Sequence, residues 1–162
     1  MVVALAWTFL VVVLAIAACV TSFPEQRARP LPHWRLLLLP LLMAAATAVL
    51  FYVPPSNDLR DPAVWMAALL LGVAGVARGA WIGLEVDHRQ RRLQLRRAPE
   101  AFWIALAAAL LIVADILAEP VGRLDSSFVQ TAELALAVLT SIVVGRNAAL
   151  LVRSRDIPQH DL

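Results

Sequence analysis

The chain has 162 residues, of which 61% are hydrophobic and only 16% are charged, against roughly 25% charged residues in an ordinary soluble domain. A single soluble domain of this length could not bury so much apolar surface. The composition therefore excludes a soluble enzyme, a disordered tail and a disulfide scaffold. We therefore expect an integral, multi-pass membrane protein. All 14 Lys and Arg positions are arginine, which favours a GC-rich bacterial genome. The expected location is thus a bacterial cytoplasmic (inner) membrane.

Long apolar runs predict five transmembrane helices in one membrane domain that covers residues 1–162. A helix needs about 20 mostly apolar residues to cross a bilayer. The predicted spans are residues 2–23, 36–53, 62–84, 101–118 and 127–152. Nine of the ten prolines fall between or at the edges of these spans, and only Pro40 lies within one. This distribution agrees with the spans because proline costs about 3 kcal/mol or more inside a helix.

The arginines predict the orientation of the chain in the membrane. Twelve of the 14 fall on one side of the five spans, which leaves Arg60 and Arg123 on the other side. Arginine is enriched in cytoplasmic loops, so we expect an outer N-terminus and a cytoplasmic C-terminus. Trp34, Trp81 and Trp103 would then lie at the inner membrane interface, where tryptophan is enriched.

The only cysteine is Cys19, which excludes an internal disulfide or a two-thiol relay. The run Ile16-Ala17-Ala18-Cys19 resembles a bacterial lipobox. A signal peptide needs a basic segment before its apolar run, and none is present. We therefore favour an ordinary buried thiol over a lipidated one.

Four glycines in the third predicted helix share one helical face. Gly72, Gly75, Gly79 and Gly83 follow one another at intervals of three or four residues, and two of these intervals are GxxxG pairs. Small residues let helices approach closely within a membrane. We expect this face to pack inside the protein's own bundle, and the alternative is a contact with a second copy or a partner subunit.

After this helix the apolar residues alternate with polar ones, which predicts a small cytoplasmic β-hairpin between the third and fourth helices. Ile82, Leu84 and Val86 alternate on one arm, and Leu93 and Leu95 alternate on the other. Its arginines are candidate contacts to lipid headgroups, although a positive-inside signal is the simpler interpretation. These arginines are Arg89, Arg91, Arg92, Arg96 and Arg97.

The same region carries a family resemblance. It contains Ala77-Arg78-Gly79, then Leu84-Glu85-Val86-Asp87, then Leu93-Gln94-Leu95-Arg96-Arg97-Ala98-Pro99 before a new helix. Over about residues 75–117 the chain resembles small uncharacterised bacterial multi-pass membrane proteins, loosely including the CcdC-type proteins. The resemblance implies a multi-pass helical fold and, as an alternative function, a role related to cytochrome c biogenesis. A thiol relay in that role finds no support, because one cysteine cannot form an exchange pair.

Four charged residues inside or near the ends of spans form a candidate intramembrane polar site: Arg78, Asp115, Glu133 and Arg146. Arg78 and Arg146 lie near inner ends, from which their side chains can snorkel to the headgroups. Asp115 and Glu133 lie near the outer leaflet, with Arg123 in the loop between their helices. We favour a structural arrangement, and an ion or proton site and a subunit contact are the alternatives.

The sequence shows no pattern of catalytic residues. It has no His/Cys/carboxylate cluster with metal spacing, no phosphate-binding glycine loop and no nucleophile motif. We therefore expect a protein that is not an enzyme, with no cofactor, no metal and no nucleic-acid partner. The leading hypothesis is an accessory or scaffold subunit of a larger membrane assembly. As partners we expect the lipid bilayer and either further copies of the chain, in a homo-oligomer, or a larger membrane complex. The alternative is a small oligomeric ion or solute transporter that uses Asp115 and Glu133.

Overall fold

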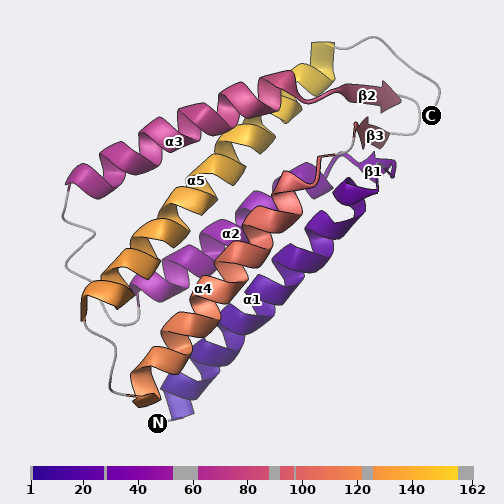
Figure 1. Cartoon of the computed structure of the whole chain (residues 1–162). Coiled ribbons are helices and arrows are strands. Elements are labelled where there is room, and N and C mark those ends of the chain that lie inside the picture. The colour runs from indigo at the N-terminus through magenta and orange to yellow at the C-terminus, as the bar shows by residue number, and fades with distance from the viewer. Residues whose placement is uncertain are drawn as a thin grey trace.

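The computed structural model describes residues 2–27, 29–52, 62–87, 92–96, 98–121 and 126–156. Five long helices contain most of them (Figure 1). The helices are α1 (Val2–Gln26), α2 (Arg35–Tyr52), α3 (Pro62–Trp81), α4 (Glu100–Val121) and α5 (Ser126–Asp156). Each observed helix begins within one residue of a predicted span and ends within four residues of it. The prediction of a mostly helical protein is therefore confirmed.

Four of the helices form a ring, and the fifth lies outside it. α1 packs against α2 and α4, and α5 packs against the same two helices from the other side. α3 packs along α5 on the outside of this four-helix bundle (Figure 1). Within the part of the chain that the structure describes, α5 is thus the only helix in extensive contact with three others.

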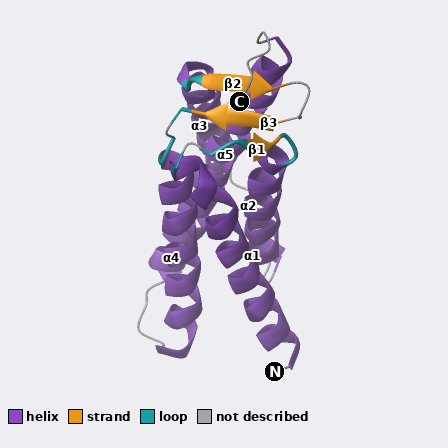
Figure 2. Cartoon of the chain, turned by 90° about the vertical axis from the view of Figure 1, so that its right-hand side faces the viewer, coloured by secondary structure: helices purple, strands orange, loops and turns teal. Residues whose placement is uncertain are grey.

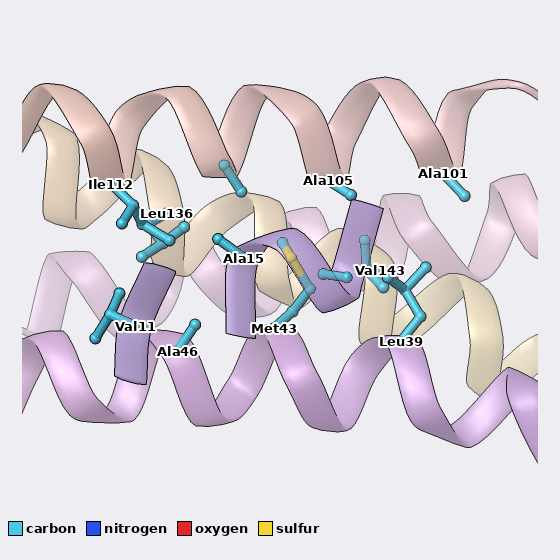
Figure 3. Packing of buried hydrophobic residues seen from close by; sticks show 12 residues of the cluster. Val11, Ala15, Leu39, Met43, Ala46, Ala101, Ala105, Ile112, Leu136 and Val143 are labelled. Carbon is cyan, nitrogen blue, oxygen red and sulfur yellow. The ribbon is translucent and has the colours of Figure 1, made fainter. Parts of the chain in front are cut away.

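The interior of the four-helix bundle is lined mainly by small and medium-sized apolar side chains (Figure 3). Alanines predominate, so the helix backbones approach one another closely. Among the described side chains, α3 contributes none to this cluster. The buried members are Val11, Ala15 and Ala18 of α1, Leu39, Met43 and Ala46 of α2, Ala101, Ala105, Ala108 and Ile112 of α4, and Leu136 and Val143 of α5.

A small antiparallel sheet lies across one end of the bundle, which we call the sheet end (Figure 2). Its strands are β1 (Leu31–Pro32), β2 (Leu84–Asp87) and β3 (Arg92–Leu95), in the order β1-β3-β2. β2 and β3 are the two arms of the predicted hairpin, and Val86 pairs with Leu93. β1 was not predicted, because two residues are too few to show alternation.

The sheet covers a second apolar cluster at the ends of the helices. Alternate residues of β2 and β3 point into it, among them Val86, Leu93 and Leu95, which are almost fully buried. Leu36 at the start of α2 and Leu150 near the end of α5 complete its floor. The apolar alternation in the sequence therefore identifies the correct inward face of the hairpin.

Two stretches within the described residues are long and apolar enough to cross a membrane. They are Trp7–Glu25, with a mean hydropathy of 2.1, and Leu134–Asp156, with a mean hydropathy of 1.9. The apolar stretches of the other three helices are shorter. By length and composition the structure thus gives two candidate spans where five were predicted, which favours a membrane location only weakly.

Candidate functional site

A fully buried ion pair joins α1 to α5 near the sheet end. Nη2 of Arg146 lies 2.7 Å from Oε2 of Glu25. The side chain of Arg146 is 0% exposed and that of Glu25 is 4% exposed. Removing a charged group from water costs on the order of several kcal/mol for each ion. Close pairing and good hydrogen bonds offset this cost. Each residue therefore makes the burial of the other tolerable.

Asn147 extends this pair to α2. Nη1 of Arg146 donates to Oδ1 of Asn147 at 2.8 Å. The amide nitrogen Nδ2 of Asn147 donates in turn to the carbonyl oxygen of Leu36 at 2.8 Å. Leu36 lies in the first turn of α2, so Asn147 connects the start of that helix to α5.

A second ion pair connects the remaining two helices at the same end. The guanidinium of Arg78 on α3 donates to Oε1 of Glu100 on α4, from Nη2 at 2.9 Å and from Nε at 3.0 Å. The negative charge of Glu100 also repels that of Glu25. We call Glu25, Arg78, Glu100, Arg146 and Asn147 the polar layer. Between them, with the Leu36 carbonyl, they involve all five helices.

The two ion pairs differ in burial, and this difference decides what each contributes. Arg78 is 54% exposed, so its attraction to Glu100 is screened and contributes little to stability. Arg146 is fully buried, and Nε is the only one of its three side-chain nitrogens without a hydrogen-bond partner in the described chain. The chemistry that this arrangement supports is charge compensation between helices. No group of three or more His, Cys, Asp or Glu side chains among the described residues could hold a metal ion.

The structure places the predicted arginines in different environments. Arg78 is exposed at the end of α3 and paired with Glu100, and contact of its side chain with headgroups stays a prediction. The same expectation for Arg146 is wrong, because its guanidinium is buried inside the bundle against Glu25. The sequence analysis missed Glu25 because it treated Pro24 as the end of the first helix. α1 continues to Gln26, with Pro24 inside its last turns.

The two predicted outer-leaflet acids cannot be assigned partners. Asp115 lies on α4 and Glu133 on α5, and these helices pack against each other. Their side chains, and Arg123 in the loop between them, lie outside the described residues. A polar site at this end of the bundle therefore stays a prediction.

Three of the four predicted glycines pack against α5. A Cβ atom on Gly75 would collide with the backbone of Ile142, and one on Gly79 would collide with the backbone of Arg146. Gly145, which the sequence analysis did not include, faces the Gly72 backbone in the same way. The order of these contacts shows that α3 and α5 run parallel. The glycine face thus packs within the chain itself.

Gly83 belongs to a different contact. It follows the end of α3, and a Cβ atom there would lie 3.0 Å from the Cβ of Arg96. The backbone N–H of Arg96 donates to the carbonyl of Gly83 at 2.9 Å. Gly83 therefore accommodates the hairpin rather than a neighbouring helix.

Arg153 fixes the end of α3 from α5, a role that the sequence analysis missed. Its Nη1 donates to the carbonyl oxygens of Gly79 and Ile82, both at 2.8 Å. The last carbonyls of a helix have no partner within the helix, and a cation there also interacts favourably with the helix dipole. α3 is therefore held by close backbone packing along its length and by this arginine at its end.

The candidate lipid-contacting arginines of the hairpin are described only in part. Arg92 on β3 and Arg96 directly after it are exposed, and Arg92 lies opposite the buried Asp87 in the β2–β3 register. Arg89, Arg91 and Arg97 lie outside the described residues. Contact of this group with lipid stays a prediction.

Comparison with known proteins adds no identification: no family model, no curated protein and no solved structure matches the chain. The resemblance to the CcdC-type proteins therefore rests on the quoted residues alone. Cys19 is a free, partly buried thiol within α1.

Proposed function

We propose that the chain is an integral membrane protein with five spans, an outer N-terminus and a cytoplasmic sheet end. The surface of its helices supports this proposal. On α1 the exposed residues between Phe9 and Phe23 are all apolar. A helix on the surface of a soluble protein would present charged and polar side chains there.

The interior of the bundle is apolar apart from a few buried polar groups. Several of these groups pair with one another across helices, as polar groups do where helices pack in lipid. Besides the polar layer, the hydroxyl groups of Thr47 on α2 and Thr140 on α5 lie 2.8 Å apart, and both residues are buried. Each helix has 18 to 31 residues, or about 27 to 47 Å at 1.5 Å per residue, against a hydrocarbon core of about 30 Å.

The aromatic residues at the sheet end support the proposed placement in the membrane. Trp34 precedes α2, Trp81 ends α3 and Trp103 lies in the first turn of α4. These three side chains are 58%, 84% and 59% exposed. Exposed tryptophans at one level around a bundle are typical of a membrane–water interface. The sheet would then project from the bilayer on the arginine-rich, cytoplasmic side.

Within the membrane, the function that the geometry supports best is that of a non-enzymatic accessory or scaffold subunit. The observation that carries this proposal is the position of α3. The described side chains of this helix add nothing to the core of the bundle, yet glycine contacts and Arg153 hold it firmly against α5. Its outer face is a row of large exposed apolar side chains, namely Trp65, Met66, Leu69, Leu70, Val73 and Val76. Such a helix widens the lateral surface that a partner helix can contact.

The alternative function is that of a small oligomeric ion or solute transporter. It requires Asp115 and Glu133 to line a pathway, and the described residues add no specific observation in its favour. A role related to cytochrome c biogenesis likewise stays what the resemblance implies.

The intact mass of the particle extracted from the native membrane tests the scaffold proposal. The tagged protein is purified in mild detergent, and its co-eluting components are identified. We expect a stoichiometric complex with another membrane protein. A monomer would contradict the proposal, and a pure homo-oligomer would favour the transporter instead.

A matched pair of variants tests the role of α3 in that complex. Leu69→Ala with Val73→Ala shortens two side chains on the outer face of α3, and Ile16→Ala with Val20→Ala does the same on the outer face of α1. We expect the α3 variant to lose the partner and the α1 variant to retain it. Retention of the partner by both variants would show that α3 is not the contact surface.

A further inference from the structure

We propose that the linker between α1 and α2 binds the phosphate group of an anionic phospholipid at the cytoplasmic face of the membrane. Three arginines lie in or beside this short segment: Arg27, Arg29 and Arg35. The inference rests on the proposed membrane location, which places the linker at the level of the headgroups. The linker arginines are distinct from those of the β2–β3 hairpin.

These three arginines have no carboxylate partner among the described residues, unlike Arg78 and Arg146 at the same end of the bundle. Arg78 and Arg146 form ion pairs with Glu100 and Glu25. Arg153 is engaged with two backbone carbonyls. Three positive charges without a partner in one linker are available for an external anion.

Two of the three guanidinium groups lie over aromatic rings. The Cζ atom of Arg27 is 4.9 Å from the centre of the Phe23 ring, and that of Arg35 is 5.7 Å from the centre of the Trp34 ring. Stacking restricts the planar guanidinium and leaves its edge free to donate two parallel hydrogen bonds, which suits a phosphate. The two side chains are therefore partly organised for binding.

An apolar surface adjoins Arg27. The rings of Phe23 and Phe102 meet edge to face at 5.9 Å, and those of Phe102 and Trp103 meet at 5.7 Å. Phe23 is 42% exposed and Trp103 is 59% exposed. An aromatic row next to a cation matches the two parts of a lipid, with the phosphate on the arginine and the glycerol and upper acyl chains on the rings. A free inorganic anion would make no use of this row.

The turn that leads into α2 also has unused hydrogen-bonding capacity. Nδ1 of His33 and Nε of Arg35 are buried, and neither has a hydrogen-bond partner in the described chain. The backbone N–H groups of Leu36 and Leu37 are already bound to the carbonyls of His33 and Trp34. The proposed site therefore depends on the arginine side chains and not on the start of the helix.

The test compares lipid selectivity between two variants that lose the same charge. The variants are Arg27→Gln with Arg35→Gln in the linker, and Arg92→Gln with Arg96→Gln in the hairpin. Each purified protein is titrated with mixed micelles that contain phosphatidylglycerol or phosphatidylcholine, and binding is read by native mass spectrometry. We expect the linker variant to lose selectivity for phosphatidylglycerol, by about fivefold for each arginine, while the hairpin variant keeps it. Arg27→Gln alone, at an exposed position, serves if the double variant does not fold.

Other results would overturn either the lipid site or the membrane location on which it rests. Equal losses in the two double variants would show general electrostatic attraction and overturn a site in the linker. Displacement of phosphatidylglycerol by inorganic phosphate alone would assign the site to a soluble anion and overturn the lipid assignment. Extraction of the protein from membranes by alkaline carbonate would instead overturn the proposed membrane location. Retention in the membrane without lipid selectivity overturns only the present inference.

Discussion

The guanidinium of Arg146 and the carboxylate of Glu25 lie 2.7 Å apart although 121 residues separate them in the chain. Both side chains are excluded from the surface, so neither helix can move away without exposing a charge to an apolar environment. The contact therefore fixes the position of α1 relative to α5 at the sheet end. With the Asn147–Leu36 hydrogen bond it aligns three of the four helices of the bundle.

The first prediction concerns the loss of one charge of this pair. Arg146→Met leaves Glu25 buried without a partner, and we expect the free energy of unfolding to fall by about 3–5 kcal/mol. Adding Glu25→Leu to Arg146→Met removes both charges and should restore most of that loss. Arg78→Met, in the exposed pair, should cost about 0–1 kcal/mol.

Unfolding of the purified variants in detergent, followed by circular dichroism, measures these differences. A double variant as unstable as the single one would show that the interaction is more than charge compensation.

A second prediction separates the glycines of α3. Gly75→Ala places a Cβ against the backbone of Ile142, so α3 must shift outward, at a cost of about 1–3 kcal/mol. At Gly72 the nearest atom to such a Cβ is the Ser141 carbonyl oxygen, at an ordinary 3.7 Å. Gly72→Ala should therefore be neutral. Thermal unfolding in the same detergent compares the two, and equal stability would contradict the close packing of α3 on α5.

The end of α3 gives a third prediction. Arg153→Gln removes the two hydrogen bonds to the carbonyls of Gly79 and Ile82, and we expect a loss of about 1–3 kcal/mol. The effect should be local, with faster amide exchange in the last turn of α3 and in β2. Arg155→Gln is the matched control, because Arg155 is exposed. Identical exchange in the two variants would show that Arg153 does not hold this end.

Periodicity and charge were sufficient to predict the helices and the hairpin. The five long apolar runs coincide closely with α1 to α5, because a helix satisfies the backbone hydrogen bonds of such a run internally. The alternation around residues 82–95 likewise identified β2 and β3 and the side of the hairpin that is buried. Both patterns are local and repeat over several residues.

Contacts between two residues that lie far apart in the chain leave no such pattern in the sequence. Glu25 looked like a loop residue after Pro24, and nothing in its neighbourhood indicates that Arg146 lies opposite it. Gly145 stands alone in α5, so only its position against Gly72 reveals its role. The strand β1 forms because β3 offers it an edge, and Leu31–Pro32 shows no strand pattern of its own.

The most direct test of the central claim is to map which side of the membrane each connection faces. Cys19→Ser removes the only native thiol, and single cysteines are then placed at Arg29, Asn57, Gln90, Gly122 and Gln159. A membrane-impermeant maleimide is applied to intact spheroplasts and to permeabilised ones. We expect labelling of positions 57 and 122 from outside, and of positions 29, 90 and 159 only after permeabilisation. Recovery of the protein in the soluble fraction, or labelling that does not alternate along the chain, would contradict five spans.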